Sequence, residues 1–126
     1  MQRRSFVLGL TAAPFAAPFV TAAFAQGPDP AGDIARAAIE QTKSRVVYDP
    51  AYVAIPYPGG DVPADRGVCA DVIIRALRKS GADLQVLVHE DMKANFAAYP
   101  KRWGAKKPDR NIDHRRVRSA IVYFRR

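Results

Sequence analysis

The segment Pro56–Pro63 constrains the fold of this chain more than any other stretch of its sequence. It contains three prolines and two glycines in eight residues. Proline lacks the backbone N–H that a helix or a central strand must donate, and glycine weakens both kinds of element. The segment is therefore predicted to be a loop. This loop leads within six residues to Cys69, the only cysteine in the chain.

The residues that follow the loop predict a helix from Cys69 to Ser80. Apolar side chains recur at helical spacing along one face, whereas charged side chains occupy the other. Gly81 supplies the expected end of the helix, because glycine readily adopts the left-handed conformation of a C-terminal cap. The apolar face consists of Ile73, Ile74, Ala76 and Leu77, and the charged face of Asp71, Arg75 and Arg78.

Cys69 lies at the start of this predicted helix, where a thiol is readily made nucleophilic. The first N–H groups of a helix have no partner within the helix and carry a partial positive charge, which favours the thiolate form of a cysteine. We expect Cys69 to lie in the first turn and to line a cleft with the loop Tyr57–Asp65. The alternative is a buried, inert thiol, because free cysteine is also common in protein cores.

Local signals predict further secondary structure on both sides of this helix. An aspartate that precedes an apolar segment of helical period is a natural N-terminal cap, and runs of β-branched and aromatic residues favour strands. The expected elements are a helix that begins after the cap Asp33, strands at Arg45–Tyr48 and Tyr52–Ile55, a helix from Leu84 to Tyr99 with the cap Asp83, and a strand at Ser119–Phe124.

Residues 1–25 have the composition of an export signal. A basic start with the pair Arg3-Arg4 precedes an Ala- and Phe-rich apolar run, which ends in the small-x-small pattern Ala23–Ala25. The arginine pair resembles a twin-arginine signal, and two prolines interrupt the apolar run, which disfavours a transmembrane anchor. We predict that cleavage before Gln26 releases a periplasmic or secreted protein of 101 residues, with a spacer at 26–32 and one domain at 33–126.

The two histidines are the only candidates of the usual kind for a general base. Cysteine hydrolases need an imidazole within hydrogen-bond reach of the sulfur. His114 has polar neighbours that can orient its ring, so it is the candidate base, with a structural hydrogen-bonding role as the alternative. His89 falls within a predicted helix that offers no second zinc ligand at helical spacing, so a zinc site is not expected there. The sequence also contains no glycine-rich loop of the kind that binds phosphate. The sequence therefore predicts no metal and no cofactor.

The C-terminal segment Lys93–Arg126 is strongly basic. It holds eleven lysines and arginines against two aspartates, a net charge of +9, while the whole chain carries +8. Such a block attracts anionic surfaces. A non-catalytic basic envelope-binding module is therefore the alternative to an enzyme, with phosphate-rich polymer or anionic lipid headgroups as partners and Trp103, Tyr123 and Phe124 as contact area. Nucleic acid is not expected, because export removes it as a partner.

Eight motifs are distributed from Val46 to the end of the chain. They are Tyr48–Tyr52, Tyr57–Pro63, Arg66–Arg75, Asp83–Gln85, Val88–Met92, Tyr99-Pro100, Trp103-Gly104 and Pro108–Val117. Together they resemble an exported bacterial family that is catalogued as a domain of unknown function. That family is grouped with the papain-like, NlpC-type cysteine peptidases and amidases.

The resemblance implies an α+β, papain-like fold in which a helix that opens with the nucleophile packs on an antiparallel sheet. Cys69 matches the nucleophile position, and Ala70 stands where the family usually has a hydroxyl residue. The histidine base of the family lies in a later segment, with a Gly-Asp turn and a Pro-His strand, that this chain does not contain. The chain therefore looks like the N-terminal portion of a member, truncated before most of its antiparallel sheet.

The function that the resemblance implies is hydrolysis of an amide or peptide bond in a cell-envelope substrate. A cell-wall peptide or an anionic envelope polymer is the expected partner. We expect the chain as given to be catalytically inactive, because turnover needs a base to protonate the leaving amine. We also expect self-association through the apolar face of the helix at Ile73–Leu77, which a missing sheet would leave exposed.

Overall fold

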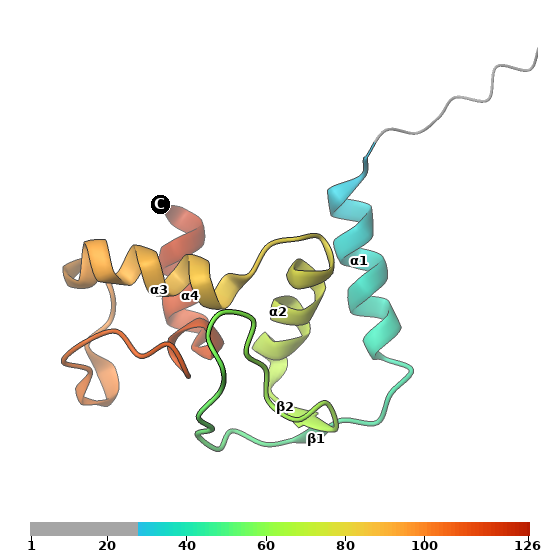
Figure 1. Ribbon diagram of the computed structural model, residues 1–126, viewed down its shortest axis with the longest axis horizontal. Coiled ribbons are helices and arrows are strands. Elements are labelled where there is room, and N and C mark those ends of the chain that lie inside the picture. The colour runs from blue at the N-terminus through green and yellow to red at the C-terminus, as the bar shows by residue number, and fades with distance from the viewer. Residues whose placement is uncertain (1–27) are drawn as a thin grey trace, which may run out of the picture.

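The computed structural model describes residues 28–126 of the chain (Figure 1). The predicted signal peptide at 1–25, its cleavage site and the first residues of the spacer lie outside the described residues. Within residues 28–126, none of the helices has the length and apolar character needed to cross a membrane.

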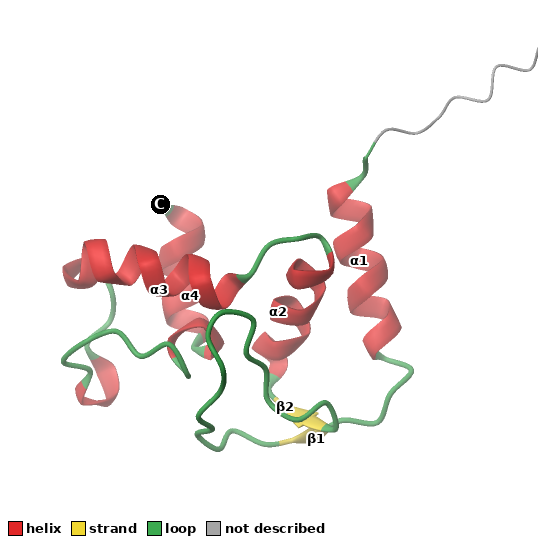
Figure 2. Ribbon diagram, viewed as in Figure 1, coloured by secondary structure: helices red, strands yellow, loops and turns green. Residues whose placement is uncertain are grey.

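The described residues form a mainly helical structure with two very short strands (Figure 2). Three 3₁₀ turns connect the last two α-helices and complete the C-terminal half. The α-helices and strands are, in order, α1 (Pro30–Gln41), β1 (Val47–Tyr48), β2 (Arg66–Gly67), α2 (Cys69–Lys79), α3 (Leu84–Asn95) and α4 (Val117–Arg125). The 3₁₀ turns are η1 (Phe96–Ala98), η2 (Arg102–Gly104) and η3 (Asp113–Arg115).

The predictions for α2 and for the start of α3 are confirmed, whereas the predicted end of α3 at Tyr99 is wrong by four residues. Ser80 is the C-terminal cap of α2, and Gly81 has a φ of 91°, a conformation that suits glycine. Asp83 caps α3 by accepting a hydrogen bond from the N–H of Gln85 at 3.1 Å. The α-helix ends at Asn95, and η1 continues the chain to Tyr99.

Helix α1 begins earlier than the sequence suggested. Its N-terminal cap is Asp29, which accepts a hydrogen bond from the N–H of Gly32 at 2.9 Å, and Pro30 occupies the first helical position. The expected cap, Asp33, lies inside the first turn. The helix therefore includes the last three residues of the predicted spacer at 26–32, because proline suits the first turn of a helix, where no N–H partner is needed.

The predicted strand at Ser119–Phe124 is wrong, because this segment belongs to α4. Its β-branched and aromatic residues favour a strand locally. In the helix, however, Ser119 is buried and Val122 and Tyr123 lie three and four residues further on, so the three share one face. Val122 and Tyr123 pack against the buried core, and this packing overrides the local preference.

The two strands pair in parallel, with Val47 opposite Arg66 and Tyr48 opposite Gly67. The predicted strand at 45–48 is thus confirmed in its last two residues. The predicted strand Tyr52–Ile55 is a loop, in which the N–H of Ile55 donates to the side chain of Asn111 at 3.2 Å. The described residues contain no antiparallel pair, and the papain-like fold stays a proposal.

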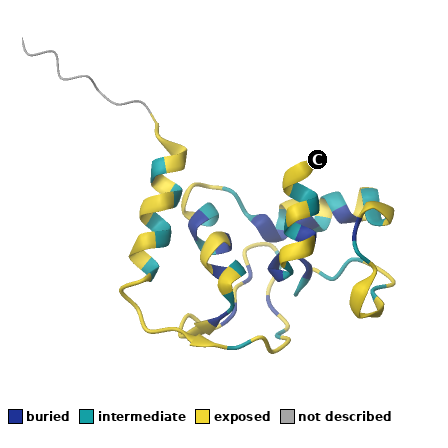
Figure 3. Ribbon diagram, turned by 180° about the vertical axis from the view of Figure 1, so that it is seen from behind, coloured by how far each residue is buried: buried dark blue, intermediate teal, exposed yellow. Residues whose placement is uncertain are grey.

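The core lies where α2, α3 and α4 meet, whereas α1 has no buried residue (Figure 3). The expected apolar face of α2 is split between core and surface. Ile74 and Ala76 are buried, while Ile73 is about half exposed. The buried cluster consists of Ile74, Leu84, Val88, Met92 and Tyr99, and Ala70, Leu77, Phe96, Val122 and Tyr123 pack against it.

The Pro- and Gly-rich segment is a loop, as predicted, and Gln85 on α3 fixes its backbone. The fully buried side chain of Gln85 accepts a hydrogen bond from the N–H of Gly60 at 2.9 Å. Its amide nitrogen donates to the carbonyl oxygens of Pro56 at 2.9 Å and Arg110 at 3.1 Å. Gln85 therefore supplies two of the partners that the loop cannot find in a helix or strand.

Replacing Gln85 by Met should strongly destabilise the protein. Methionine keeps the volume of the side chain but leaves one buried N–H and two carbonyl groups without partners, so we expect the free energy of unfolding to fall by about 3 kcal/mol. Urea denaturation measures this change. The matched control is Gln41→Met, because the amide of Gln41 donates to carbonyls near the surface, and we expect a loss below about 1 kcal/mol. Equal losses in the two variants would contradict this account.

Candidate functional site at the start of helix α2

Cys69 is the first residue of α2 and its side chain is exposed. The prediction that it lies in the first turn is confirmed, and the alternative of a buried thiol is wrong. A thiol in this position combines access to solvent with the partial positive charge of a helix start.

The chain between β2 and α2 is held in place by Asp71. The carboxylate of Asp71 accepts a hydrogen bond from the N–H of Val68 at 2.6 Å and so caps the helix from inside its first turn. A Cβ atom on Gly67 would lie only 2.6 Å from the same carboxylate, so this position has no room for a side chain. Gly67 and Asp71 thus fix the approach of the chain to Cys69.

Asp71 also forms a buried ion pair with Arg115 of η3. Nε of Arg115 donates to Oδ1 of Asp71 at 2.8 Å and Nη2 donates to Oδ2 at 2.9 Å, and both side chains are 3% exposed. Burial by itself raises the pKa of Asp71, but the hydrogen bonds from Arg115 and from the N–H of Val68 outweigh it and lower that pKa. The carboxylate is therefore held in its charged form.

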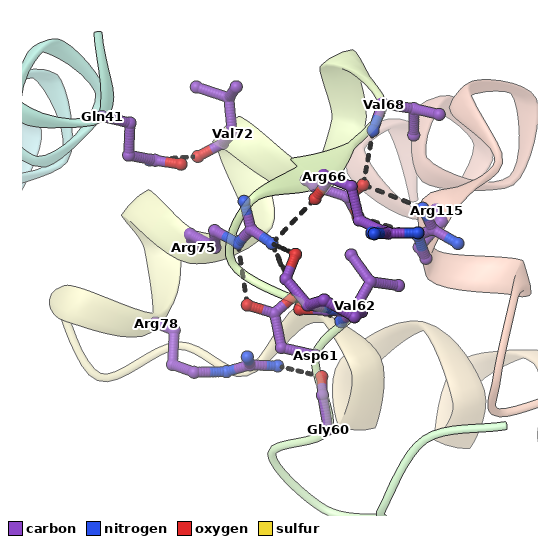
Figure 4. Close-up of polar contacts among 12 residues, drawn as sticks. Gln41, Gly60, Asp61, Val62, Arg66, Val68, Val72, Arg75, Arg78 and Arg115 are labelled. Atoms are coloured by element: carbon purple, nitrogen blue, oxygen red, sulfur yellow. Dashed lines mark hydrogen bonds and ion pairs between the residues drawn. The ribbon is translucent and has the colours of Figure 1, made fainter. Parts of the chain in front are cut away.

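Two arginines of α2 hold the loop that precedes Cys69 (Figure 4). The guanidinium of Arg75 forms an ion pair with Asp61 at 2.7 Å and also donates to the carbonyls of Val62, Pro63 and Arg66. The guanidinium of Arg78 donates to the carbonyl of Gly60 at 3.1 Å. The loop therefore packs along α2 through its backbone and is fixed on the side away from α1.

The hollow beside Cys69 has a volume of about 330 Å³ and lies between α2, the end of α1 and β1. The expected cleft with the loop Tyr57–Asp65 is wrong, because that loop is held by Arg75 and Arg78 along another side of α2. Gln41 fixes the end of α1 here by donating to the carbonyl of Val72 at 3.0 Å. The lining residues are Ala38, Gln41, Thr42, Ser44, Val46, Tyr48, Gly67, Val68, Cys69, Val72 and Arg75.

Within residues 28–126, no hydrogen bond engages the backbone N–H groups of Cys69 and Ala70 at the start of α2, so both can donate to an oxyanion. Among the described residues, the N–H of Val68 is engaged by Asp71 and the N–H of Asp71 by the carbonyl of Val68 at 2.9 Å. The N–H groups of Cys69 and Ala70 occupy the first two helical positions, which have no acceptor within the helix. These donors lie next to the sulfur.

Neither histidine lines the hollow beside Cys69. His114 is buried, and its pKa is lowered to about 4, mainly by burial and then by the charge of Arg115. This placement lends no support to His114 as the base for Cys69, and that role stays a prediction. His89 packs edge-to-face on Tyr57, with the two ring centroids 5.3 Å apart.

A second hollow, of about 560 Å³, lies in the C-terminal half of the molecule. Sequence reasoning missed it, because its walls come from segments that are far apart in the chain. Tyr52 lines the hollow and donates a hydrogen bond to the carboxylate of Asp109, which lies 57 residues away in sequence. The lining residues are Tyr52, His89, Arg116 and the segment 103–111. Among residues 28–126, no cluster of three or more histidine, cysteine or acidic side chains can hold a metal ion.

Comparison with known proteins relates most of this chain to one family. A family model described as "Domain of unknown function (DUF1287)" matches residues 35–126. A protein of Escherichia coli K12 described as "Uncharacterized protein YijF" is 60% identical over 93 residues, which are 74% of this chain and 45% of that protein. The chain thus spans less than half the length of this relative. No solved structure matches the chain.

Acidification should destabilise the protein through His114. The pKa of its imidazole is about 6.5 in the unfolded chain and about 4 in the folded one, so between these values the unfolded chain binds more protons. We expect the free energy of unfolding to fall by about 2 kcal/mol from pH 7 to pH 5 through this group. Urea titrations at both pH values measure the change. In His114→Gln, the fall in the free energy of unfolding from pH 7 to pH 5 should be smaller by about 2 kcal/mol. If the variant loses as much stability on acidification as the unmodified chain, His114 is not the cause.

Proposed function

The chain belongs to the DUF1287 family, and we propose that it carries the nucleophile of an exported, papain-like cysteine hydrolase. The observation that carries this proposal is the placement of Cys69. Its thiol is exposed at the first position of α2, beside a hollow of about 330 Å³ that has room for part of a substrate. A buried structural cysteine has neither feature.

The proposed reaction is acyl transfer from an amide. The thiolate of Cys69 attacks the carbonyl carbon of the substrate, and the bond between sulfur and carbon forms as the carbonyl oxygen becomes an oxyanion. The carbon–nitrogen bond then breaks, and the amine leaves with a proton, which gives a thioester. Water hydrolyses the thioester to the carboxylic acid and restores the thiol.

The start of α2 favours this reaction electrostatically. The N–H groups of Cys69 and Ala70 are directed outward at the positive end of the helix dipole, where they can stabilise the oxyanion. Asp71 does not compete for these donors, because its carboxylate is engaged by Val68 and Arg115. The capping carboxylate thus orders the helix start and leaves its first two donors available.

On this proposal, a group that does not line the hollow within residues 28–126 supplies the proton for the leaving amine. Neither His89 nor His114 lines the hollow, so on this proposal the base belongs to a part of the complete protein other than the described residues. The relative from E. coli has more than half of its length outside the matched region. The proposed substrate is a cell-wall peptide, which an exported enzyme meets in the envelope.

The full chain should show a reactive thiol that forms an acyl-enzyme without a base. With p-nitrophenyl acetate, whose leaving group needs no proton, we expect one acetyl group per chain by mass spectrometry. Acylation should be several-fold faster in the folded chain than in the chain unfolded by urea at the same pH, because only the folded chain places the N–H groups of the helix start where they stabilise the oxyanion. Cys69→Ser is the control for the site, since the chain has no other cysteine. Equal rates in folded and unfolded chains would exclude an activated nucleophile.

The same preparation should not hydrolyse model cell-wall peptides, because an amide needs its leaving amine protonated. Chromatography of the peptides after incubation measures this. Hydrolysis that Cys69→Ala abolishes would show that a group within this chain delivers the proton, and His114 would then be the first residue to replace.

A further inference from the structure

The second hollow is cationic. Of the four lysines and arginines that line it, Lys106, Lys107 and Arg110 form no ion pair with any of the described residues. Arg116 pairs with Asp113 at 2.9 Å. The hollow also contains one carboxylate, that of Asp109, so positive charge predominates and an anionic ligand is favoured.

An aromatic ring faces solvent at the edge of this hollow. Trp103 is 61% exposed, and the guanidinium of Arg116 lies over one face of its ring at 4.6 Å from the centroid, which leaves the other face open. Its φ of 61° is in the left-handed region, which is unfavourable for a residue other than glycine. Strain of this kind persists only where the surrounding structure holds the residue in place, and it is concentrated at functional sites.

The polar wall of the hollow is held rigidly. The hydroxyl of Tyr52 donates to the carboxylate of Asp109 at 3.1 Å and accepts a hydrogen bond from the side chain of Asn111 at 2.7 Å. Gln85 anchors the same segment through the carbonyl of Arg110, and the N–H of Asp109 donates to Asp113. A ligand therefore meets preformed hydrogen-bonding groups, which reduces the entropy lost on binding.

We propose that this hollow binds an anionic saccharide, a sugar ring that bears a phosphate or a carboxylate group. The ring stacks on the open face of Trp103, since an aromatic face offers a large and rigid apolar contact. The sugar hydroxyls hydrogen-bond to the remaining lone pairs of the Asp109 carboxylate and to the second N–H of the Asn111 amide, the first N–H being donated to Tyr52. The negative group binds Lys106, Lys107 and Arg110 through charge-assisted hydrogen bonds. Inorganic phosphate would use the cations alone, and a neutral sugar would use the ring and the polar wall alone.

This site is separate from the candidate nucleophile and does not depend on its chemistry. The segment 103–111 lies at the end of the molecule away from α1 (Figure 1), whereas the hollow beside Cys69 is lined by α1. None of the residues that line one hollow lines the other. Binding here can therefore be measured whether or not Cys69 is a catalytic residue.

The fluorescence of Trp103 reports directly on the site, because the chain has no other tryptophan. The full chain is titrated at constant ionic strength with N-acetylglucosamine 6-phosphate, glucuronic acid, N-acetylglucosamine and inorganic phosphate. We expect saturable changes with the two charged sugars, and their relative affinities distinguish phosphate from carboxylate as the anionic group. Neutral sugar and inorganic phosphate should each bind at least about tenfold more weakly. Equal binding of inorganic phosphate and the sugar phosphate would overturn the proposal.

The double variant Lys106→Gln/Lys107→Gln tests the cationic wall. We expect it to weaken binding of the charged sugars at least about tenfold, since hydrogen bonds to charged groups are the strong ones. The matched control is the double variant Arg45→Gln/Lys79→Gln, which removes the same two positive charges at exposed residues without an ion pair in the described structure and should bind as the unmodified chain does. Circular dichroism shows whether each variant is folded. An equal loss in the control and the double variant would mean that only the overall charge of the protein attracts the sugars, and would refute the site.

Discussion

Asp71 and Arg115 form a bidentate ion pair that is almost completely removed from solvent, and the arrangement of the remaining elements depends on it. The pair joins η3 to the first turn of α2 across 44 residues of sequence. Removing either partner leaves an uncompensated buried charge, which typically costs about 3–5 kcal/mol. A third hydrogen bond to Asp71, from the N–H of Val68, extends the effect to the chain that connects β2 with α2. One carboxylate thus links the C-terminal half to the candidate nucleophile.

Sequence reasoning succeeded where the signals are local. The bounds of α2 and the start of α3 follow from Gly81, from the cap Asp83 and from apolar residues at helical spacing, all within a few residues of these helix ends. It failed for α4, because the residues that make the segment helical are its partners in the core and not its neighbours in sequence. Nothing in the run of apolar residues from Ile121 to Phe124 indicates that α3 lies alongside.

The basic segment Lys93–Arg126 shows that the sequence also does not reveal which charged residues are buried. A run of lysines and arginines normally indicates a solvated surface, yet Arg115 is buried in an ion pair and Arg116 stacks on Trp103. Asp71, the partner of Arg115, lies 44 residues away in sequence, too far for the pairing to be inferred from spacing. The place of Cys69 at the helix start could be predicted, whereas its hollow could not, because α1 packs against α2 through contacts such as that of Gln41 with Val72.

The double role of Asp71 couples the stability of the domain to the geometry at Cys69. The same carboxylate caps α2 and neutralises Arg115, so we expect a change at η3 to alter the orientation of the first turn as well as the free energy of unfolding. Cys69 itself contributes no comparable contact, because its side chain faces solvent. A loss of thiol reactivity in a variant of Arg115 is therefore a positional effect transmitted through Asp71, whereas loss in a variant of Cys69 concerns the reacting atom alone. The two are separable because the first also destabilises the fold and the second does not.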